Sequence, residues 1–222
     1  MILLRNVSIR NPNPARQHLL LDSVSLLIPD KSRIGILAPP GSGKSTIARV
    51  LSGIDKPHRG YVHTSGRVSW PLGFAGFLHP HVSIEKNLRT IAGLTGQPLD
   101  QLYHVCALFL GQSFDMRETV MNLSPSARAA LAYACCLAVP WDHVIADETI
   151  TIGTSETRAL CEAALERHLQ SSGLIFLSRN ARQLEQFCDS FFVLAGGRLR
   201  PCSDLAVAED MLEMMSKETC DV

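Results

Sequence analysis

The segment from Ala38 to Thr46 combines small residues, a lysine and hydroxyl groups at a spacing suited to holding phosphate. Its pattern, Ala38-x4-Gly43-Lys44-Ser45, follows the apolar run 33–37 and precedes the helical pattern 47–51. Glycine lets backbone N–H groups turn inward around phosphate oxygens, and a helix N-terminus adds partial positive charge. The lysine can bridge terminal phosphates, and the serine hydroxyl can ligate Mg²⁺. The residues assigned to nucleotide binding on this basis are Pro40, Gly41, Ser42, Gly43, Lys44, Ser45 and Thr46.

One alternative to a phosphate loop is a glycine–serine turn that happens to contain a lysine. Ala38 also stands where such loops usually have their first glycine, a variant that the loop tolerates. The strand before the loop and the helix after it favour the phosphate-binding interpretation, because that context is what the function requires.

A pair of carboxylates ends a second apolar run, Val144-Ile-Ala-Asp147-Glu148. Asp147 is expected to hold Mg²⁺ through water, and Glu148 to polarise the attacking water as a general base. A strand that ends in Asp-Glu is, taken alone, more often a solvated turn. Because a phosphate loop lies upstream, we assign catalytic roles to Glu148 and Lys44 and metal binding to Ser45 and Asp147.

These groups must be positioned by strands and helices that the apolar spacing predicts. Expected strands cover 24–28, 33–37, 61–62, 68–70, 143–146, 173–177 and 190–194, and Gly196-Gly197 forms a hairpin turn. Expected helices cover 47–51, 87–92 after a capping start at 83–86, 99–110, 124–138, 157–169 and 181–187. Alternating strands and helices with a helical insertion near 83–130 predict an α/β fold with a mixed sheet core, an N-terminal antiparallel β part and a helical subdomain.

Composition narrows the classes of protein to consider. The chain has 222 residues, 46% of them hydrophobic, with 21 basic and 21 acidic residues and a net charge of zero. The high hydrophobic share argues against disorder. The neutral net charge gives no electrostatic reason to expect a nucleic-acid partner. The seven cysteines include no C-x-x-C pair, and no apolar run is long enough for a membrane span. The N-terminus has no basic stretch ahead of a long apolar run, so we expect no signal peptide. We therefore expect a soluble intracellular protein with reduced thiols.

The motifs together resemble the ATPase domain of ABC transporters. The phosphate loop, the Asp-Glu pair and the helix start Leu123-Ser-Pro-Ser-Ala-Arg128 carry this resemblance. The segments Gly66-Arg-Val-Ser-Trp-Pro-Leu-Gly-Phe-Ala-Gly76 and Leu51-Ser-Gly-Ile-Asp-Lys-Pro57 are similar to ATP-binding subunits of capsular polysaccharide and O-antigen exporters. The resemblance extends from about residue 2 to residue 200.

The resemblance implies a P-loop NTPase (ABC ATPase) spanning 1–222, with 1–76 and 139–222 as the nucleotide-binding core and about 77–138 as the Q-loop and helical subdomain. It implies ATP and Mg²⁺ as cofactors, with two ATPase subunits sandwiching ATP so that each phosphate loop faces the other copy's Ser124. The second subunit is either an identical copy or a better-preserved homologue. By the same resemblance, the membrane partner would be an ABC-2 type permease that exports a lipid-linked polysaccharide and docks near 77–110. The chain would then be peripheral to the bacterial inner membrane, on its cytoplasmic face.

The sequence departs from that family at five positions or segments. His79 aligns with the glutamine that senses Mg²⁺ and water, and Ser124-Pro125-Ser126-Ala127 lacks the glycines of the signature. Thr154 aligns with the aspartate of the loop after the catalytic carboxylate, and Arg179 with the switch histidine that contacts the γ-phosphate. Asn11 lies near the position of the aromatic ring that stacks on adenine. Arg179 can still act as a cation near the γ-phosphate.

The retained loop and altered hydrolysis positions predict Mg-ATP binding with slow or transporter-dependent turnover. A hydrolysis-impaired regulatory subunit and a P-loop kinase of a small metabolite are the alternatives; the kinase would need an arginine-rich lid, whereas 77–130 holds only three arginines. Three further features have two interpretations each. His79 and His81 could form a metal pair, although a surface loop is the simpler interpretation.

Trp70 could either pack in the core or provide a stacking platform for the nucleotide. Methionines 211, 214 and 215 form an amphipathic stripe for packing or a dimer contact.

Overall fold

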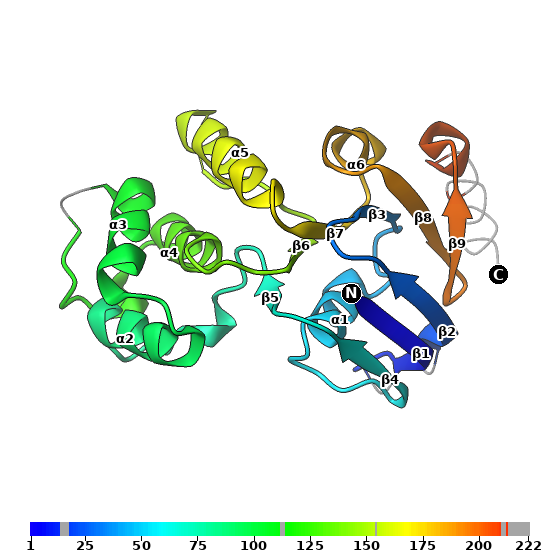
Figure 1. Ribbon diagram of the computed structural model, residues 1–222, viewed down its shortest axis with the longest axis horizontal. Helices are drawn as coiled ribbons and strands as arrows, with labels where there is room; N and C mark the ends of the chain where they lie inside the picture. Colours follow the sequence, from blue (N-terminus) through cyan, green and yellow to red (C-terminus); the bar gives the residue numbers. More distant parts are fainter. Residues whose placement is uncertain (14–17, 112–113, 154, 210–211, 213–222) are drawn as a thin grey trace. The chain divides into compact units, whose positions relative to one another are not determined.

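The computed structural model describes residues 1–13, 18–111, 114–153, 155–209 and 212 (Figure 1). The chain divides into two compact units. One, called the strand unit here, comprises Met1–Pro71, Trp141–Glu148 and Ser171–Val222. The other, called the helical unit, comprises Leu72–Pro140 and Thr149–Gln170.

Three antiparallel strands form the smaller sheet of the strand unit, in the order β2-β1-β4. Their bounds are β1, Ile2–Arg10; β2, Leu19–Ile28; and β4, Arg59–Thr64. Ile2 pairs with Ile28 on one side and with Thr64 on the other, so β1 is the central strand. Its apolar residues Ile2, Leu4, Val7 and Ile9 are buried in the core, and a register shift between Leu4 and Val7 interrupts the strict alternation of a regular strand.

Six strands form the larger sheet, in the order β5-β6-β7-β3-β8-β9. Their bounds are β3, Arg33–Leu37; β5, Val68–Pro71; β6, His143–Asp147; β7, Gly173–Ser178; β8, Ser190–Ala195; and β9, Arg198–Cys202. All neighbours are parallel except β8 and β9, which form a hairpin. Parallel strands share their carboxyl-terminal edge, so the segments that follow β3, β6 and β7 meet there.

Helices cover both faces of this sheet, which explains why β7 is buried at every position. Helix α1, Lys44–Leu51, packs on β5, β6 and β7, and helix α6, Ala181–Phe187, packs on β3 and β7 (Figure 1). The apolar side chains of α1 belong to one buried cluster with those of β1, β2 and β3. Helix α1 therefore lies between the two sheets, and its N-terminus is at the carboxyl end of β3.

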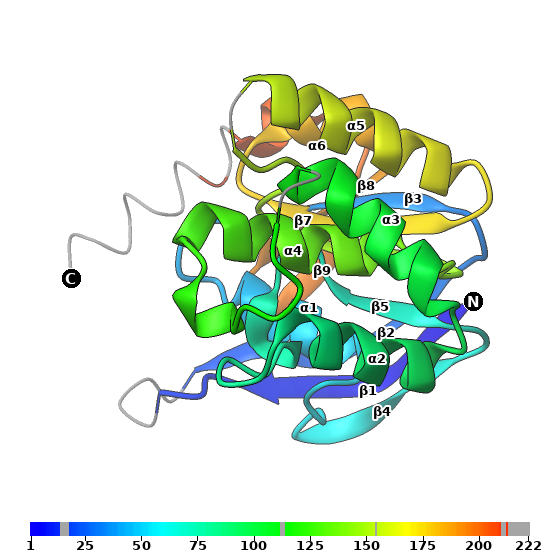
Figure 2. The ribbon, with the colours of Figure 1, turned by 90° about the vertical axis from the view of Figure 1, so that its left-hand side faces the viewer.

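The described residues of the helical unit form four α-helices and two short 3₁₀ turns (Figure 2). Its elements are η1, Ala75–Phe77; α2, Ile84–Thr95; α3, Leu99–Leu110; η2, Val120–Asn122; α4, Pro125–Leu137; and α5, Ser155–Leu169. Helix α4 is its centre and packs against both α3 and α5. The Tyr133 hydroxyl of α4 is fully buried and donates to the carbonyl of Ile150, at 2.6 Å. None of the helices in the described ranges is long and apolar enough to cross a bilayer.

The α/β class, the mixed core sheet and the N-terminal antiparallel part are confirmed. Helices 99–110 and 181–187 have the predicted bounds. The strand predicted over 24–28 begins earlier, at Leu19, because its outer half is anchored by pairing with β1. The apolar spacing predicts no strand over Ile2–Arg10, which forms β1 in the structure. Trp70 packs edge-on against Trp141, with ring centroids 4.9 Å apart, and so serves as a packing residue.

Candidate nucleotide site

The phosphate loop connects β3 to α1, as its sequence predicts. Gly41 and Gly43 take positive φ angles of 77° and 85°, a left-handed conformation that other residues adopt at a cost. Gly43 also occupies the N-cap position of α1. Because it has no side chain, it accepts no hydrogen bond from the first N–H groups of the helix. A Cβ at Gly43 would collide with the side chain of Leu20. The first N–H groups of α1 have no partner within the helix, and they are therefore available to an anion.

Lys44 points into the site rather than into solvent. Its side chain is 7% exposed, and Nζ donates to the carbonyls of Ala38 (3.1 Å) and Pro39 (2.9 Å). Nζ also forms an ion pair with Glu148 Oε1 at 2.9 Å. The structure thus brings together the two residues to which the sequence assigns catalytic roles.

Glu148 is held at the end of β6 by three contacts. Its N–H donates to the carbonyl of Leu177 at 2.8 Å, and its Oε2 accepts from the N–H of Arg179 at 3.3 Å. The third contact is the ion pair with Lys44. Its φ of 60° lies in the left-handed region, which is uncommon for a residue with a side chain. Because β7 is the neighbour of β6 in the sheet, the segment that follows β7 begins beside this carboxylate.

Asp147 and Ser45 form the candidate metal position. The Ser45 hydroxyl hydrogen bonds to the Asp147 carboxylate. Burial raises the pKa of Asp147 above its usual value, although this hydrogen bond and the Lys44 charge act in the opposite direction. Asp147 Oδ1 is buried and accepts no hydrogen bond from any described residue. A buried, unsatisfied carboxylate oxygen beside a hydroxyl fits Mg²⁺, which takes oxygen ligands from one or two side chains and completes its shell with phosphate and water.

A pocket of about 450 Å³ lies over the loop. It is lined by Asn11, Pro12, Leu20, Pro40, Gly41, Gly43, Lys44, Ser45, Thr46, Glu148 and Arg179. Arg179 is exposed and Asn11 is half-buried, so both side chains can meet a ligand. A neighbouring hollow of about 800 Å³ contains the remaining loop residue, Ser42, together with His18. The Asn11 amide contacts the His18 ring at 3.4 Å.

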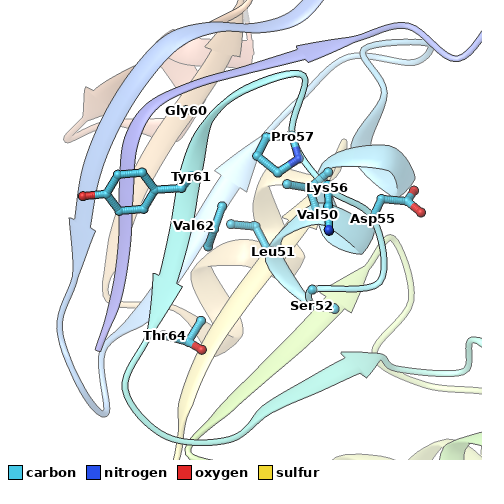
Figure 3. Close-up of a pocket in the computed structure, with 11 residues that line it drawn as sticks. Val50, Leu51, Ser52, Asp55, Lys56, Pro57, Gly60, Tyr61, Val62 and Thr64 are labelled. Atoms are coloured by element: carbon cyan, nitrogen blue, oxygen red, sulfur yellow. The ribbon is translucent and has the colours of Figure 1, made fainter.

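A different pocket, of about 370 Å³, lies at the opposite end of α1 (Figure 3). It is lined by the last residues of α1, the following turn and β4, with Val50, Leu51 and Val62 forming its apolar wall. None of the predicted site residues is in its lining. There, the carbonyl of Arg49 accepts from the N–H groups of Ile54 (2.9 Å) and Asp55 (3.2 Å).

Ser124 lies in the helical unit, at the N-cap of α4. Its hydroxyl accepts from the N–H of Ala127 at 3.1 Å and contacts the Ser126 hydroxyl at 3.0 Å. Pro125 occupies the first turn, where its missing N–H removes no helical hydrogen bond. Arg128 reaches back to the carbonyls of Met121 (3.1 Å) and Leu123 (3.3 Å).

His79 belongs to an exposed turn of the helical unit, and its ring lies 6.1 Å from that of His81. The described residues contain no cluster of three or more His, Cys, Asp or Glu side chains that could hold a metal ion. Asn87 fixes this turn: its Oδ1 accepts from the His79 N–H at 2.8 Å, and its Nδ2 donates to the Val82 carbonyl at 3.2 Å. Thr154 and methionines 211, 214 and 215 lie outside the described residues.

Sequence reasoning missed two residues that shape these regions. Leu20, which packs against the phosphate loop, reads as an ordinary strand residue. Asn87, which is 5% exposed, sits at a core-facing position of an apolar helical pattern. A buried polar residue is normally hydrogen-bonded. A polar side chain at a core-facing position of the helical pattern is therefore the signal from which a structural role for Asn87 could be predicted.

Comparison with known proteins places this geometry in a family. The sequence model described as ABC transporter matches residues 21–151. The polysialic acid transport ATP-binding protein KpsT of Escherichia coli is 28% identical over 193 residues, which are 85% of this chain and 87% of that protein. The capsule polysaccharide export ATP-binding protein CtrD of Neisseria meningitidis serogroup B is 29% identical over 205 residues, which are 92% of this chain and 95% of that one.

Among solved structures, the ATP-binding cassette MJ0796, a dimer in a post-hydrolysis state bound to ADP and Pi, superposes with a TM-score of 0.74. It is 18% identical in sequence, and the match covers 91% of this chain and 98% of that one. The likeness extends over the mixed core sheet and the N-terminal antiparallel sheet. The chain therefore belongs to the ABC transporter family and has the fold of its ATP-binding cassette.

Proposed function

We propose that this chain is the ATP-binding subunit of an ABC exporter, which hydrolyses Mg-ATP to drive export of capsular or related lipid-linked polysaccharide through an ABC-2 type membrane subunit. The observation that carries the ATPase part is the 2.9 Å ion pair between Lys44 and Glu148 beside the open N-terminus of α1. The export part is supported by the relatives, whose names describe transport of polysialic acid and export of capsule polysaccharide.

In this proposal, ATP places its phosphates against the N-terminus of α1 and the Lys44 ammonium. The ammonium then exchanges its carboxylate partner for phosphate oxygens, which releases Glu148 Oε1. The freed carboxylate can accept a proton from the attacking water as general base. Arg179, in the lining of the same pocket, supplies positive charge at the γ-phosphate.

Ser45 and Asp147 would hold the magnesium ion, which neutralises charge on the phosphate oxygens when it is bound. The hydroxyl would ligate it directly, and the carboxylate through water. The fit of these residues is supported by the unsatisfied Asp147 Oδ1 beside the Ser45 hydroxyl.

The site is completed by a second subunit in this proposal. Ser124 of that subunit would contact the γ-phosphate from the opposite side, in an identical or a homologous copy. The proposal keeps the division into 1–76 with 139–222 as core and about 77–138 as Q-loop and helical subdomain, and it assigns the docking of the membrane partner to the segment near 77–110. The assembly would lie at the cytoplasmic face of the inner membrane.

A second candidate, a nucleotide-binding regulatory subunit with impaired hydrolysis, is favoured by one observation. The Ser124 hydroxyl already accepts from Ala127 and contacts Ser126, and the ring of Pro125 follows it directly. A hydroxyl in that arrangement is less free to turn toward a partner's phosphate, which would slow turnover without affecting binding.

ATP binding and phosphate release by the chain, with Mg²⁺ and with or without its membrane partner, test the proposal. Lys44→Ala should abolish binding, whereas Lys56→Ala, a matched loss of an exposed lysine in the 370 Å³ pocket, should not. Glu148→Gln should retain binding and lose turnover by about 10²–10⁴-fold, the contribution of a positioned base. Binding without turnover above the Glu148→Gln level, even with the membrane partner, would favour the regulatory subunit. Binding that does not depend on Lys44 would overturn both candidates.

A further inference from the structure

The loop that follows β7 carries Arg179, and side chains from three parts of the strand unit hold its backbone. The Arg179 N–H donates to Glu148 Oε2 at 3.3 Å, and the Asn180 N–H donates to Ser178 Oγ at 3.1 Å. The Ala181 N–H donates to Glu209 Oε1 at 2.9 Å. Glu209 lies 28 residues further along the chain and outside the lining of the 450 Å³ pocket.

A short helical segment, 205–209, delivers Glu209 to this loop. Leu205 and Ala208 are each 2% exposed and anchor the segment in the core. Asp204 Oδ1 caps its first turn by accepting from the N–H groups of Ala206 (2.9 Å) and Val207 (3.2 Å). Two buried apolar contacts and a cap therefore fix the place from which the Glu209 carboxylate reaches Ala181.

The contact between Glu209 and Ala181 is a strong one for physical reasons. A carboxylate that accepts from a backbone N–H forms a charge-assisted hydrogen bond, about twice as strong as a neutral one. Ala181 is 4% exposed, so its N–H would be left poorly solvated if the carboxylate were removed.

We propose that Glu209 is a positioning residue for Arg179 and thereby sets the preference of this site for a nucleoside triphosphate over a diphosphate. Glu148 accepts from the N–H of Arg179 itself, and Glu209 accepts from the N–H of Ala181, two residues further along, while Arg179 is in the lining of the 450 Å³ pocket. Loss of the Glu209 contact lets the start of α6 shift, and Arg179 moves with it. The γ-phosphate is the group that Arg179 addresses, so ATP loses affinity and ADP does not. This inference rests on the proposed function.

The test is a set of dissociation constants for Mg-ATP and Mg-ADP on the purified full chain. Glu209→Ala should weaken ATP binding about tenfold, the effect of one charged hydrogen bond, and leave ADP binding unchanged. Glu209→Gln keeps an acceptor oxygen and should restore the preference. Glu185→Ala removes an equal charge from an exposed position on α6 and should change neither constant. Should Glu209→Ala unfold, Glu209→Asp, which withdraws the carboxylate by one methylene, serves in its place.

A double-mutant comparison separates positioning from general stability. If Glu209 acts through Arg179, the double variant Arg179→Ala/Glu209→Ala should bind ATP no more weakly than Arg179→Ala alone. Additive losses, an equal loss of ATP and ADP, or no loss would each overturn the inference. Binding that is independent of Lys44 would instead overturn the proposed function, so the two failures are distinguishable.

Discussion

Helices α1 and α4 are the two helices whose N-termini the sequence assigns to nucleotide, and they begin in contrasting ways. Helix α1 begins after Gly43, which has no side chain to cap it, and its first N–H groups remain open. Helix α4 begins after Ser124, whose hydroxyl accepts from the N–H of Ala127, the third residue of its own helix. The start of α1 is therefore arranged for an external anion, whereas that of α4 is already satisfied from within.

The surroundings of the two helix starts differ in the same sense. Near α1, a buried ammonium and two carboxylates form a connected set: Lys44, Asp147 and Glu148. Near α4, the neighbouring hydroxyls of Ser124 and Ser126 contact each other at 3.0 Å. A helix N-terminus is thus not in itself an anion site, because a local cap can use the same donors that a ligand needs.

The sharpest test of this contrast is an alanine at the start of α1. Gly43→Ala should reduce ATP binding by at least about 10²-fold, because its Cβ meets Leu20 and its φ of 85° is unfavourable for alanine. Gly53→Ala is the matched control, since Gly53 has a φ of 73° and open space around its Cβ position. It should lower stability by about 1 kcal/mol and leave binding intact. Calorimetric titration measures the ATP affinity of both variants, and thermal unfolding measures their stability.

A second prediction concerns the metal position beside α1. Asp147→Asn should lower the affinity for Mg²⁺ in the presence of ATP by about 10–100-fold, the effect expected of a group that holds the metal through water. Asn retains the size of the side chain but loses its charge. Mg²⁺ titrations at fixed ATP give the affinity directly. An unchanged Mg²⁺ requirement would assign the metal to other ligands.

The start of α4 allows a third prediction. Ser124→Ala and Ser83→Ala each remove an N-cap within the helical unit, since the Ser83 hydroxyl accepts from the N–H of Lys86 at 3.3 Å. Each should lower the free energy of unfolding by about 1 kcal/mol. Turnover by the assembled transporter should fall only in Ser124→Ala. Equal turnover in both variants would mean that α4 does not contact nucleotide.

The smallest expected effect is at the other end of α1, beside the pocket in Figure 3. Arg49 forms a 3.0 Å ion pair with Asp55 there, and the two side chains are 45% and 35% exposed. Solvent screens such a pair, so Arg49→Ala should change stability by less than about 1 kcal/mol and leave ATP binding unchanged. Denaturant unfolding and nucleotide titration check the two statements. Weaker binding would extend the functional part of α1 to its far end.

Local chemistry made the phosphate loop and the end of β6 predictable. A glycine–lysine–serine pattern between strand and helix, and a carboxylate pair after an apolar run, are short-range signals. The contact between Lys44 and Glu148 depends instead on sheet order, with β7 inserted between β3 and β6. The pairing of β1 with β2 and β4, and the reach of Glu209 to Ala181, are likewise long-range. No local pattern encodes such pairings, because they arise only when distant segments pack.

The left-handed backbone of Glu148 has a consequence for how this position can change over generations. A φ of 60° costs a glutamate about 1–3 kcal/mol, a cost that glycine escapes and asparagine largely reduces. Glycine or asparagine would relieve this cost, but either would also remove the 2.9 Å ion pair with the buried Lys44 ammonium, so a library selected only for folded abundance measures which of the two effects is larger at residue 148. In a library selected for export, the carboxylate should be retained. Under the general-base role that we propose for Glu148, the strained backbone at this position is a cost that the protein bears for the sake of its chemistry.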